Sequence, residues 1–170
     1  MDYRIAIVED NATARTTLRG HLLPIAKLNV SSFGSGVELK SALRKQHFEL
    51  IIMDYHLGQG RTGVEWVQSL KESGFIRPST GLIFLTSDRS PQTLLIKPYT
   101  IASLSRQIKH YLSYCKYIEP VLREMDNKQR PSAITLLRKK LREGVPPRLA
   151  SDVGKLYAKL LFENEDILHA

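Results

Sequence analysis

Polar side chains follow four apolar runs of the sequence, at the point where each run ends. The runs are residues 3–8 (YRIAIV), 50–53 (LIIM), 81–85 (GLIFL) and 94–96 (LLI), and the polar side chains after them are Glu9, Asp10, Asp54, Thr86 and Lys97. Short runs that are apolar throughout are typical of strands in a parallel sheet covered on both faces. Ligands bind beyond the carboxyl ends of such strands, so we expect these five side chains to lie together.

The three carboxylates of this group indicate a divalent cation. Carboxylates held about 4 to 5 Å apart repel by several kcal/mol per pair at an effective dielectric near 20, and a bound cation removes that cost. Hard oxygen donors with open coordination positions suit Mg²⁺. We expect Asp54 to be the first residue after its strand and so to face solvent, and Lys97 to hold an incoming phosphoryl group beside the cation.

Segments with helical spacing alternate with the apolar runs. Apolar residues recur at this spacing in residues 13–23, 37–43 and 64–70, and Asn11 stands where the first of these helices needs an N-cap. Residues 28–33 (LNVSSF) have the composition of a further strand. Strands that alternate with helices and are joined by right-handed crossovers predict a doubly wound α/β domain with a five-stranded parallel sheet.

Five short motifs make the first part of the chain resemble a known family. They are IAIVEDN at 5–11, LIIMDYHLG at 50–58, Gly63 at the start of the third helix, FLTS at 84–87 and IKP at 96–98. Their order and spacing resemble the receiver domain of bacterial two-component response regulators. The resemblance implies a flavodoxin-like receiver domain over residues 1–114. It also implies Mg²⁺-dependent transfer of a phosphoryl group from a histidine kinase or a phosphotransfer protein.

The resemblance assigns roles to individual residues. It implies that Asp54 is the phosphoacceptor and that Asp10 and Asp54 ligate Mg²⁺ directly, with Glu9 contributing through water and His56 through its backbone carbonyl. Such a protein is no enzyme beyond catalysing its own phosphorylation and dephosphorylation. The alternative is a phosphatase-like hydrolase that uses Asp54 as a covalent intermediate. Against it, His56 stands where a second catalytic acid is needed.

The same match extends to the end of the fifth strand. Thr86 would move its hydroxyl onto the phosphoryl group, Lys97 would pair with that group, and a cis peptide bond would precede Pro98. Leu94 stands three residues before the lysine, where the family usually has an aromatic ring that turns with the threonine. The sequence therefore does not predict how phosphorylation would change the conformation.

The connection between the fourth and fifth strands is short. Only ten residues separate Thr86 from Lys97, whereas a parallel crossover normally needs about a dozen or more beyond the strands. Residues 87–93 leave no room for a covering helix four. Either the protein lacks this helix, or the sequence lacks a segment between Thr93 and Leu94. The abrupt change from SDRSPQT to LLIKP favours the second explanation.

The chain beyond residue 100 is predicted to be helical. Residues 100–122 have the spacing of one long helix, and residues 130–144 and 146–166 form a helix pair. The apolar faces of the pair are Ala133, Ile134, Leu137 and Leu141, and then Leu149, Val153, Leu156, Tyr157 and Leu160. The pair resembles a tetratricopeptide-type repeat, a unit that buries its faces only in arrays. We therefore expect residues 115–170 to be a truncated protein-interaction region. Its last helix should expose apolar surface, which a second copy of the chain would cover in a homodimer.

The net charge of +8 makes nucleic acid a candidate partner. The excess is spread out, with 14 Lys and Arg against 9 Asp and Glu in residues 1–114, and 11 against 8 in residues 115–170. The dense cluster at 138–142 lies on an amphipathic helix, where a solvated face is the commoner explanation. A DNA-binding response regulator is the alternative. Acids at Glu143, Asp152 and Glu163 interrupt the basic surface, so we expect a downstream protein as the partner, and not DNA.

Composition excludes several other classes. A chain of 170 residues with 42% hydrophobic and 25% charged residues is typical of a globular protein. It has no apolar run long enough for a membrane span and no signal-peptide pattern at its start, so we expect no membrane contact and a cytoplasmic location. Cys115 by itself forms neither an internal disulfide nor a zinc site.

Overall fold

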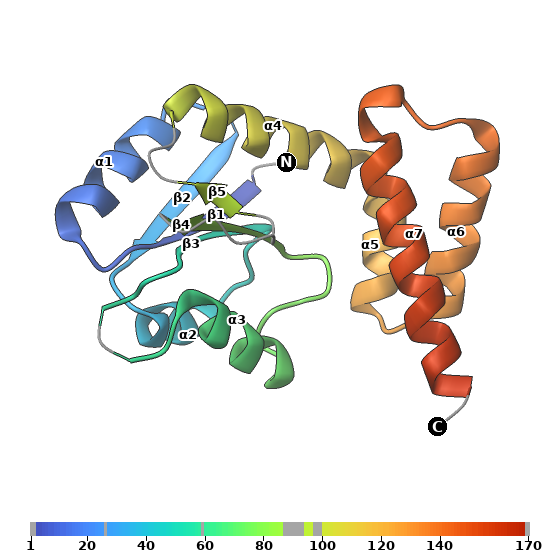
Figure 1. The fold of residues 1–170 in the computed structure, drawn as a ribbon, viewed down its shortest axis with the longest axis horizontal. Coiled ribbons are helices and arrows are strands. Elements are labelled where there is room, and N and C mark those ends of the chain that lie inside the picture. The colour runs from blue at the N-terminus through green and yellow to red at the C-terminus, as the bar shows by residue number, and fades with distance from the viewer. Residues whose placement is uncertain (1–2, 26, 59, 87–93, 97–99, 169–170) are drawn as a thin grey trace. The chain divides into compact units, whose positions relative to one another are not determined.

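A computed structural model describes residues 3–168 except residues 26, 59, 87–93 and 97–99 (Figure 1). The chain forms two compact units, an N-terminal unit, Met1–Gln107, and a C-terminal unit, Ile108–Ala170. The division falls within helix α4 (Ile101–Tyr117), and so does the predicted boundary between residues 114 and 115. One helix therefore contributes residues to both units.

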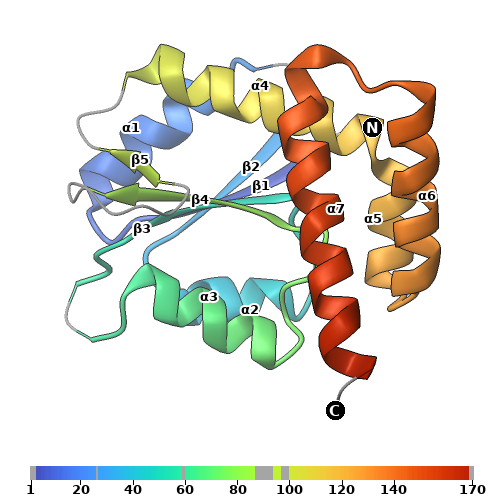
Figure 2. The same ribbon diagram turned by 45° about the vertical axis from the view of Figure 1, so that its right-hand side comes forward.

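The N-terminal unit is a parallel sheet between two layers of helices. Its elements before α4 are β1 (Tyr3–Val8), α1 (Ala12–Leu22), β2 (Leu28–Phe33), α2 (Gly36–Leu43), β3 (Leu50–Asp54), α3 (Gly63–Glu72), β4 (Gly81–Thr86) and the three-residue β5 (Leu94–Ile96). The parallel strands pair in the order β2-β1-β3-β4-β5. Helices α2 and α3 cover one face, and α1 and the beginning of α4 cover the other (Figures 1 and 2). This arrangement confirms the predicted doubly wound α/β architecture.

The central strands are buried on both faces. Ala6 and Val8 of β1 belong to the apolar cluster that packs under α2 and α3, whereas Ile5 and Ile7 are fully buried outside that cluster. Successive residues of a strand point to opposite faces. With helices on both faces, every position of these strands must be apolar, and polar side chains can enter only where the strands end.

Side-chain caps fix where the helices of this unit begin. Asn11 accepts a hydrogen bond from the backbone N–H of Ala14 at 2.9 Å, and Ser35 caps α2 in the same way. At α3, Glu65 N–H donates to the Thr62 hydroxyl at 3.2 Å and the Glu65 carboxylate accepts from Thr62 N–H at 2.7 Å. The backbone hydrogen bond from Thr62 is the main reason that the pKa of Glu65 lies below its ordinary value. The caps end the loops that follow β1, β2 and β3.

The predicted fifth strand is present and pairs in parallel with β4. The predicted lack of a helix before it, and the predicted missing segment between Thr93 and Leu94, both concern residues 87–93. These residues lie outside the part of the chain that the structure describes, so both explanations remain predictions.

The C-terminal unit contains, besides the end of α4, helices α5 (Glu119–Asp126), α6 (Arg130–Glu143) and α7 (Pro147–Leu168). The predicted single helix over residues 100–122 is wrong, because α4 ends at Tyr117 and α5 begins at Glu119. Pro120 explains the break. It has no N–H for the carbonyl four residues back and its ring clashes with that carbonyl, but it is tolerated at the start of a new helix, where it stands.

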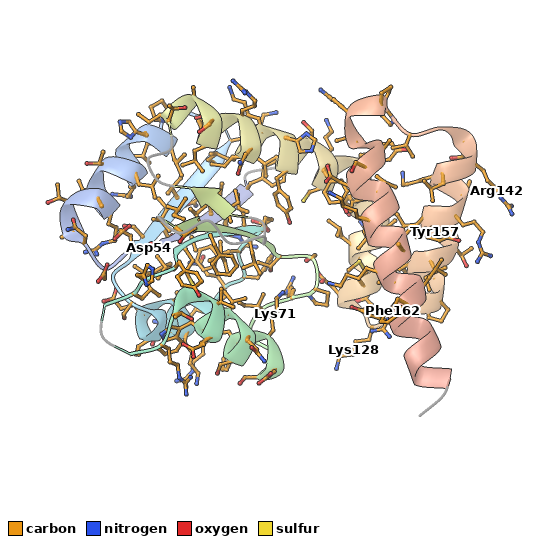
Figure 3. The ribbon with its side chains drawn as sticks, viewed as in Figure 1. Asp54, Lys71, Lys128, Arg142, Tyr157 and Phe162 are labelled. Atoms are coloured by element: carbon orange, nitrogen blue, oxygen red, sulfur yellow. The ribbon has the colours of Figure 1, made fainter. Side chains whose placement is uncertain are left out.

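Apolar packing holds the C-terminal unit together. Its core comprises Ile118, Val121, Ala133, Ile134, Leu137, Leu149, Val153 and Leu160. Helices α6 and α7 run antiparallel (Figures 1 and 2), and Arg138 Nε donates to the hydroxyl of Tyr157 at 3.2 Å. The predicted apolar faces are therefore confirmed, except that Leu141 is 37% exposed. As predicted, α7 exposes apolar surface, at Phe162 (Figure 3).

Candidate functional site

The end of β1 supplies two carboxylates with different surroundings. Glu9 is buried and Asp10 is exposed. The Glu9 backbone N–H donates to the carbonyl of Phe33 at 3.1 Å, which continues the pairing of β1 with β2 past the end of β1. A Glu9 carboxylate oxygen accepts from the backbone N–H of Asn11 at 3.1 Å. The chain turns into α1 directly afterwards, so both carboxylates are held at the carboxyl edge of the sheet.

Asp54 is the last residue of β3 and is only 6% exposed. The prediction that it follows the strand and faces solvent is therefore wrong. The strand reaches one residue further because its ladder with β4 includes the pair Asp54 and Leu85, and Tyr55 N–H still donates to the Leu85 carbonyl at 2.8 Å. The nucleophile predicted from the sequence is thus positioned by the sheet itself.

Gly63 lets α3 start close behind Asp54. A Cβ at this position would lie 2.3 Å from the backbone oxygen of Asp54, well inside contact distance. The Gly63 N–H donates to the carbonyl of Tyr55 at 2.8 Å, so the loop after β3 folds back onto the strand end. The role predicted for Gly63 as the start of the third helix is confirmed, and the close approach is its physical reason.

The structure brings some of the other predicted residues to this edge. Thr86 ends β4 and is buried, and it stands one residue beyond Leu85, the register partner of Asp54. His56 is exposed, and its ring makes an edge contact with Tyr55. Lys97 and the proline after it lie outside the described residues, so their predicted roles stay predictions.

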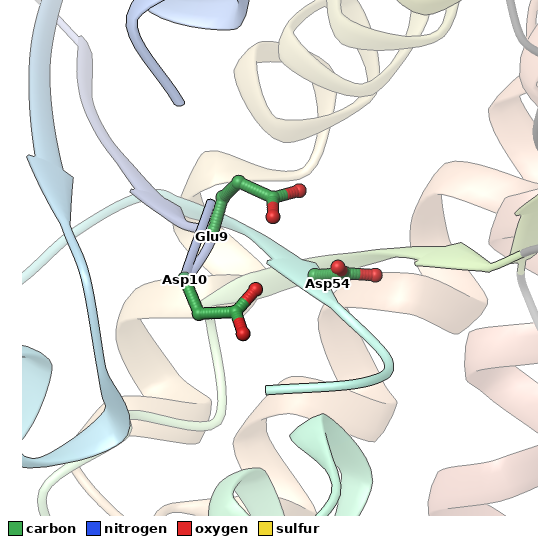
Figure 4. A group of neighbouring side chains, drawn as sticks. All are labelled: Glu9, Asp10 and Asp54. Carbon is green, nitrogen blue, oxygen red and sulfur yellow. The ribbon is translucent and has the colours of Figure 1, made fainter. Parts of the chain in front are cut away.

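The carboxylates of Glu9, Asp10 and Asp54 form one cluster (Figure 4). One carboxylate oxygen from each lies within 4.8 Å of the others. The predicted convergence of the three acids at one edge is thus found. This donor set fits a divalent cation such as Mg²⁺, because it is made of hard, negatively charged oxygens and because two of the three carboxylates are buried, where mutual repulsion is least screened.

Arg15 is a site residue that reasoning from the sequence missed. Its guanidinium Nη1 donates to the backbone carbonyls of Glu9 at 2.6 Å and of Asp10 at 3.2 Å. The only signal in the sequence was an arginine about one helical turn after the N-cap Asn11, and helical spacing alone does not indicate which backbone carbonyls its side chain reaches.

Comparison with known proteins places the chain in a family. The family model of the response regulator receiver domain matches residues 5–108. The chain therefore belongs to the receiver domain family of two-component response regulators. No curated protein matches the chain.

Similar solved structures have the same fold. The chemotaxis response regulator CheY4 of Vibrio cholerae is 21% identical, with a TM-score of 0.58 over 65% of this chain and 99% of its own. The signal receiver domain of a putative LuxO repressor protein from Vibrio parahaemolyticus is 17% identical, with a TM-score of 0.61 over 71% of this chain and 98% of its own. The isolated REC domain of RcsB from Salmonella enterica serovar Typhimurium, determined in the presence of phosphomimetic BeF3⁻, is 16% identical. Its TM-score is 0.56 over 66% of this chain and 90% of its own.

Among the helices of the described residues, none is both long and apolar enough to cross a membrane.

Proposed function

We propose that this receiver domain accepts a phosphoryl group on Asp54 from a histidine kinase or a phosphotransfer protein, in a Mg²⁺-dependent reaction. The observation that carries the proposal is the cluster of Glu9, Asp10 and Asp54, with carboxylate oxygens within 4.8 Å of one another at one sheet edge. Membership of the receiver domain family supports it. In this role the chain is a phosphoacceptor that catalyses at most its own phosphorylation and dephosphorylation.

Each residue of the edge has a defined task in the transfer. An Asp54 carboxylate oxygen attacks the phosphorus of a phosphohistidine, a P–O bond forms, and the P–N bond breaks with its electron pair going to the imidazole nitrogen, which takes up a proton. Asp10 and Asp54 would hold Mg²⁺ directly, and Glu9 through water and His56 through its backbone carbonyl would complete the site. When bound, Mg²⁺ supplies positive charge that offsets the carboxylates and the phosphoryl oxygens.

The remaining polar groups bind the transferred phosphoryl group. The hydroxyl of Thr86, at the end of the neighbouring strand β4, donates to a phosphoryl oxygen. The ammonium group of Lys97 pairs with another. Both groups act on the charge of the transferred phosphoryl group, so they would couple phosphorylation to the conformation around β4.

We place the output in the helical region, residues 115–170, as a surface that binds a downstream protein in the cytoplasm. The antiparallel pair α6 and α7 supports this, because a helix pair is the unit of the tetratricopeptide-type repeat that the sequence of residues 130–166 resembles. In this role, a neighbouring protein or a second copy of the chain would cover the exposed side chain of Phe162.

Intact mass spectrometry tests the proposal. The protein is incubated with Mg²⁺ and a small phosphodonor such as phosphoramidate, and it should gain one phosphoryl group. Asp54→Asn should gain none, whereas Asp152→Asn, the same substitution at an exposed ion pair with His110 in the C-terminal unit, should be labelled like the unaltered protein. Labelling that persists in Asp54→Asn overturns the assignment of the phosphoacceptor. The starting mass also shows whether a segment is present between Thr93 and Leu94.

A further inference from the structure

One guanidinium connects the backbone of the two acidic residues that follow β1. Arg15 Nη1 donates to the carbonyls of Glu9 and Asp10, at 2.6 Å and 3.2 Å. Hydrogen bonds from a charged donor are roughly twice as strong as those between neutral groups. Arg15 contacts the backbone carbonyls of these residues and not their carboxylates, so it fixes the position of the turn between β1 and α1.

The turn between β2 and α2 leaves room for this guanidinium. A Cβ on Gly34 would lie 3.2 Å from Arg15 Nη1 and 3.4 Å from a carboxylate oxygen of Glu38, tighter than most such contacts. The other carboxylate oxygen of Glu38 accepts from the Gly34 backbone N–H at 2.8 Å, which holds the turn in place. The turn between β2 and α2 therefore leaves space for the Arg15 guanidinium that a side chain at Gly34 would reduce.

We infer that Arg15 is a positioning residue for the carboxylate cluster: by holding the carbonyls of Glu9 and Asp10, it sets the affinity of the cluster for a divalent cation. The inference rests on the metal-binding part of the proposed function. Without a cation, repulsion among the three carboxylates favours opening of the turn that carries two of them. The guanidinium opposes that movement, and removing groups of this kind, which orient metal ligands, typically weakens metal affinity about 10- to 100-fold.

The charge of Arg15 has the opposite effect, which makes the inference testable. A positive charge near the cluster repels a cation. If Arg15 acted only through its charge, replacing it by alanine would tighten cation binding. If it positions the turn, the same replacement weakens binding. The sign of one measured change therefore separates the two roles.

The experiment measures Mn²⁺ binding by EPR of the free ion, with Mg²⁺ as competitor and without phosphodonor. We expect Arg15→Ala to weaken binding about 10-fold. Arg15→Lys, which keeps the charge but carries its donors on a shorter side chain, should weaken it less. Gly34→Ala, whose added Cβ would lie 3.2 Å from Nη1 and so shift the guanidinium by a few tenths of an ångström, should also weaken it, but less than Arg15→Ala does. Arg19→Ala is the matched control, because it removes the same charge from an exposed position one turn further along α1 and should not weaken binding.

Each outcome of this experiment either supports or overturns the inference about Arg15. Unchanged or tighter binding in Arg15→Ala and Gly34→Ala overturns the inference. So does a loss of thermal stability without a loss of affinity, since that shows a purely structural role. If Arg15→Ala does not fold, Arg15→Lys and Gly34→Ala decide in its place. Absence of binding by the unaltered protein overturns both the inference and the metal site. Normal binding that depends on Arg15, together with no phosphoryl uptake, refutes only the proposed function.

Discussion

In the N-terminal unit, three strands end in buried polar side chains, whereas the core of the C-terminal unit is apolar. Among the described residues, the buried polar or charged side chains are Glu9, Asp54 and Thr86, at the ends of β1, β3 and β4. The core cluster of the C-terminal unit consists of Ile, Val, Leu and Ala side chains. Both units contain packed helices, but among the described residues only the N-terminal unit has buried charged side chains.

The difference predicts that substitutions have different effects in the two units. Burying a carboxylate costs free energy unless partners compensate it, so a fold that keeps two of them does so at the expense of stability. Apolar packing has no such cost in free energy, because it buries no charged group. Stability and cation binding should therefore respond to different substitutions in the two units.

The largest expected effect is in the apolar core of α6. Leu137 has no exposed surface, and Leu137→Ala should lower the free energy of unfolding of the C-terminal unit by about 3 kcal/mol, from lost burial and the cavity left behind. Leu141→Ala, the same change at a 37% exposed position of the same helix, should cost less than about 1 kcal/mol. Urea denaturation measures both. Cation affinity should not change in either variant, and a parallel loss of affinity in Leu137→Ala would show that the two units depend on each other.

Gly63→Ala should destabilise the N-terminal unit by about 2 kcal/mol, because the added Cβ would lie 2.3 Å from the Asp54 carbonyl oxygen. Gly20→Ala is the matched control. Nothing lies within 4 Å of a Cβ there, and Gly20 is inside α1, so the substitution should stabilise by about 0.5 to 1 kcal/mol. Thermal unfolding followed by circular dichroism should give shifts of opposite sign. Equal shifts would mean that α3 can move away from β3 at little cost.

Asp54→Asn should stabilise the protein without cations by about 1 kcal/mol, because it removes a buried charge that repels two others. Asp10→Asn should act in the same direction but more weakly, since Asp10 is exposed and solvent screens its charge. Chemical denaturation in the presence of a chelator measures both. Added Mg²⁺ should stabilise the unaltered protein and not Asp54→Asn. Destabilisation by Asp54→Asn under these conditions would show that the interactions that stabilise the Asp54 carboxylate outweigh its repulsion by the other two carboxylates.

Much of the N-terminal unit could be predicted because two constraints act together on the same residues. Strands covered on both faces must be apolar at every position, so β1 and β3 are recognisable as unbroken runs, and polar residues mark their ends. Asn11 identified the start of α1 because a side-chain acceptor there satisfies a helix N–H that has no other partner. These rules are local, and they also made it possible to predict that Glu9, Asp10 and Asp54 lie at one edge of the sheet.

Contacts between elements could not be predicted in the same way. The burial of Asp54 depends on how far the ladder between β3 and β4 extends, and the contacts of Arg15 depend on the turn at Gly34. Neither is encoded in a single segment. The break between α4 and α5 is a different case, because Pro120 acts locally and its effect could have been predicted from the sequence. The helical period continues across it, but period alone does not distinguish one helix from two that follow each other.

The smallest expected effect concerns the other end of the sheet, at the side chain of His47. The ring of His47 lies 2.9 Å from a carboxylate oxygen of Glu49 and 2.7 Å from Nη2 of Arg4. Burial, and then the charges of Arg77 and Arg4, lower the pKa of His47 below its ordinary value of 6.5. The unfolded chain therefore binds a proton here at a higher pH than the folded chain does. Stability should rise with pH through the range just below 6.5 and be lost as the pH falls through it.

His47→Gln should flatten this part of the profile of unfolding free energy against pH. Glu49→Gln should steepen it, because the Glu49 carboxylate partly offsets the lowering of the pKa of His47. Urea denaturation at a series of pH values, at low and at high salt, measures the slopes. A slope that is the same in the unaltered protein and in both variants would show that His47 does not contribute to the pH dependence of stability.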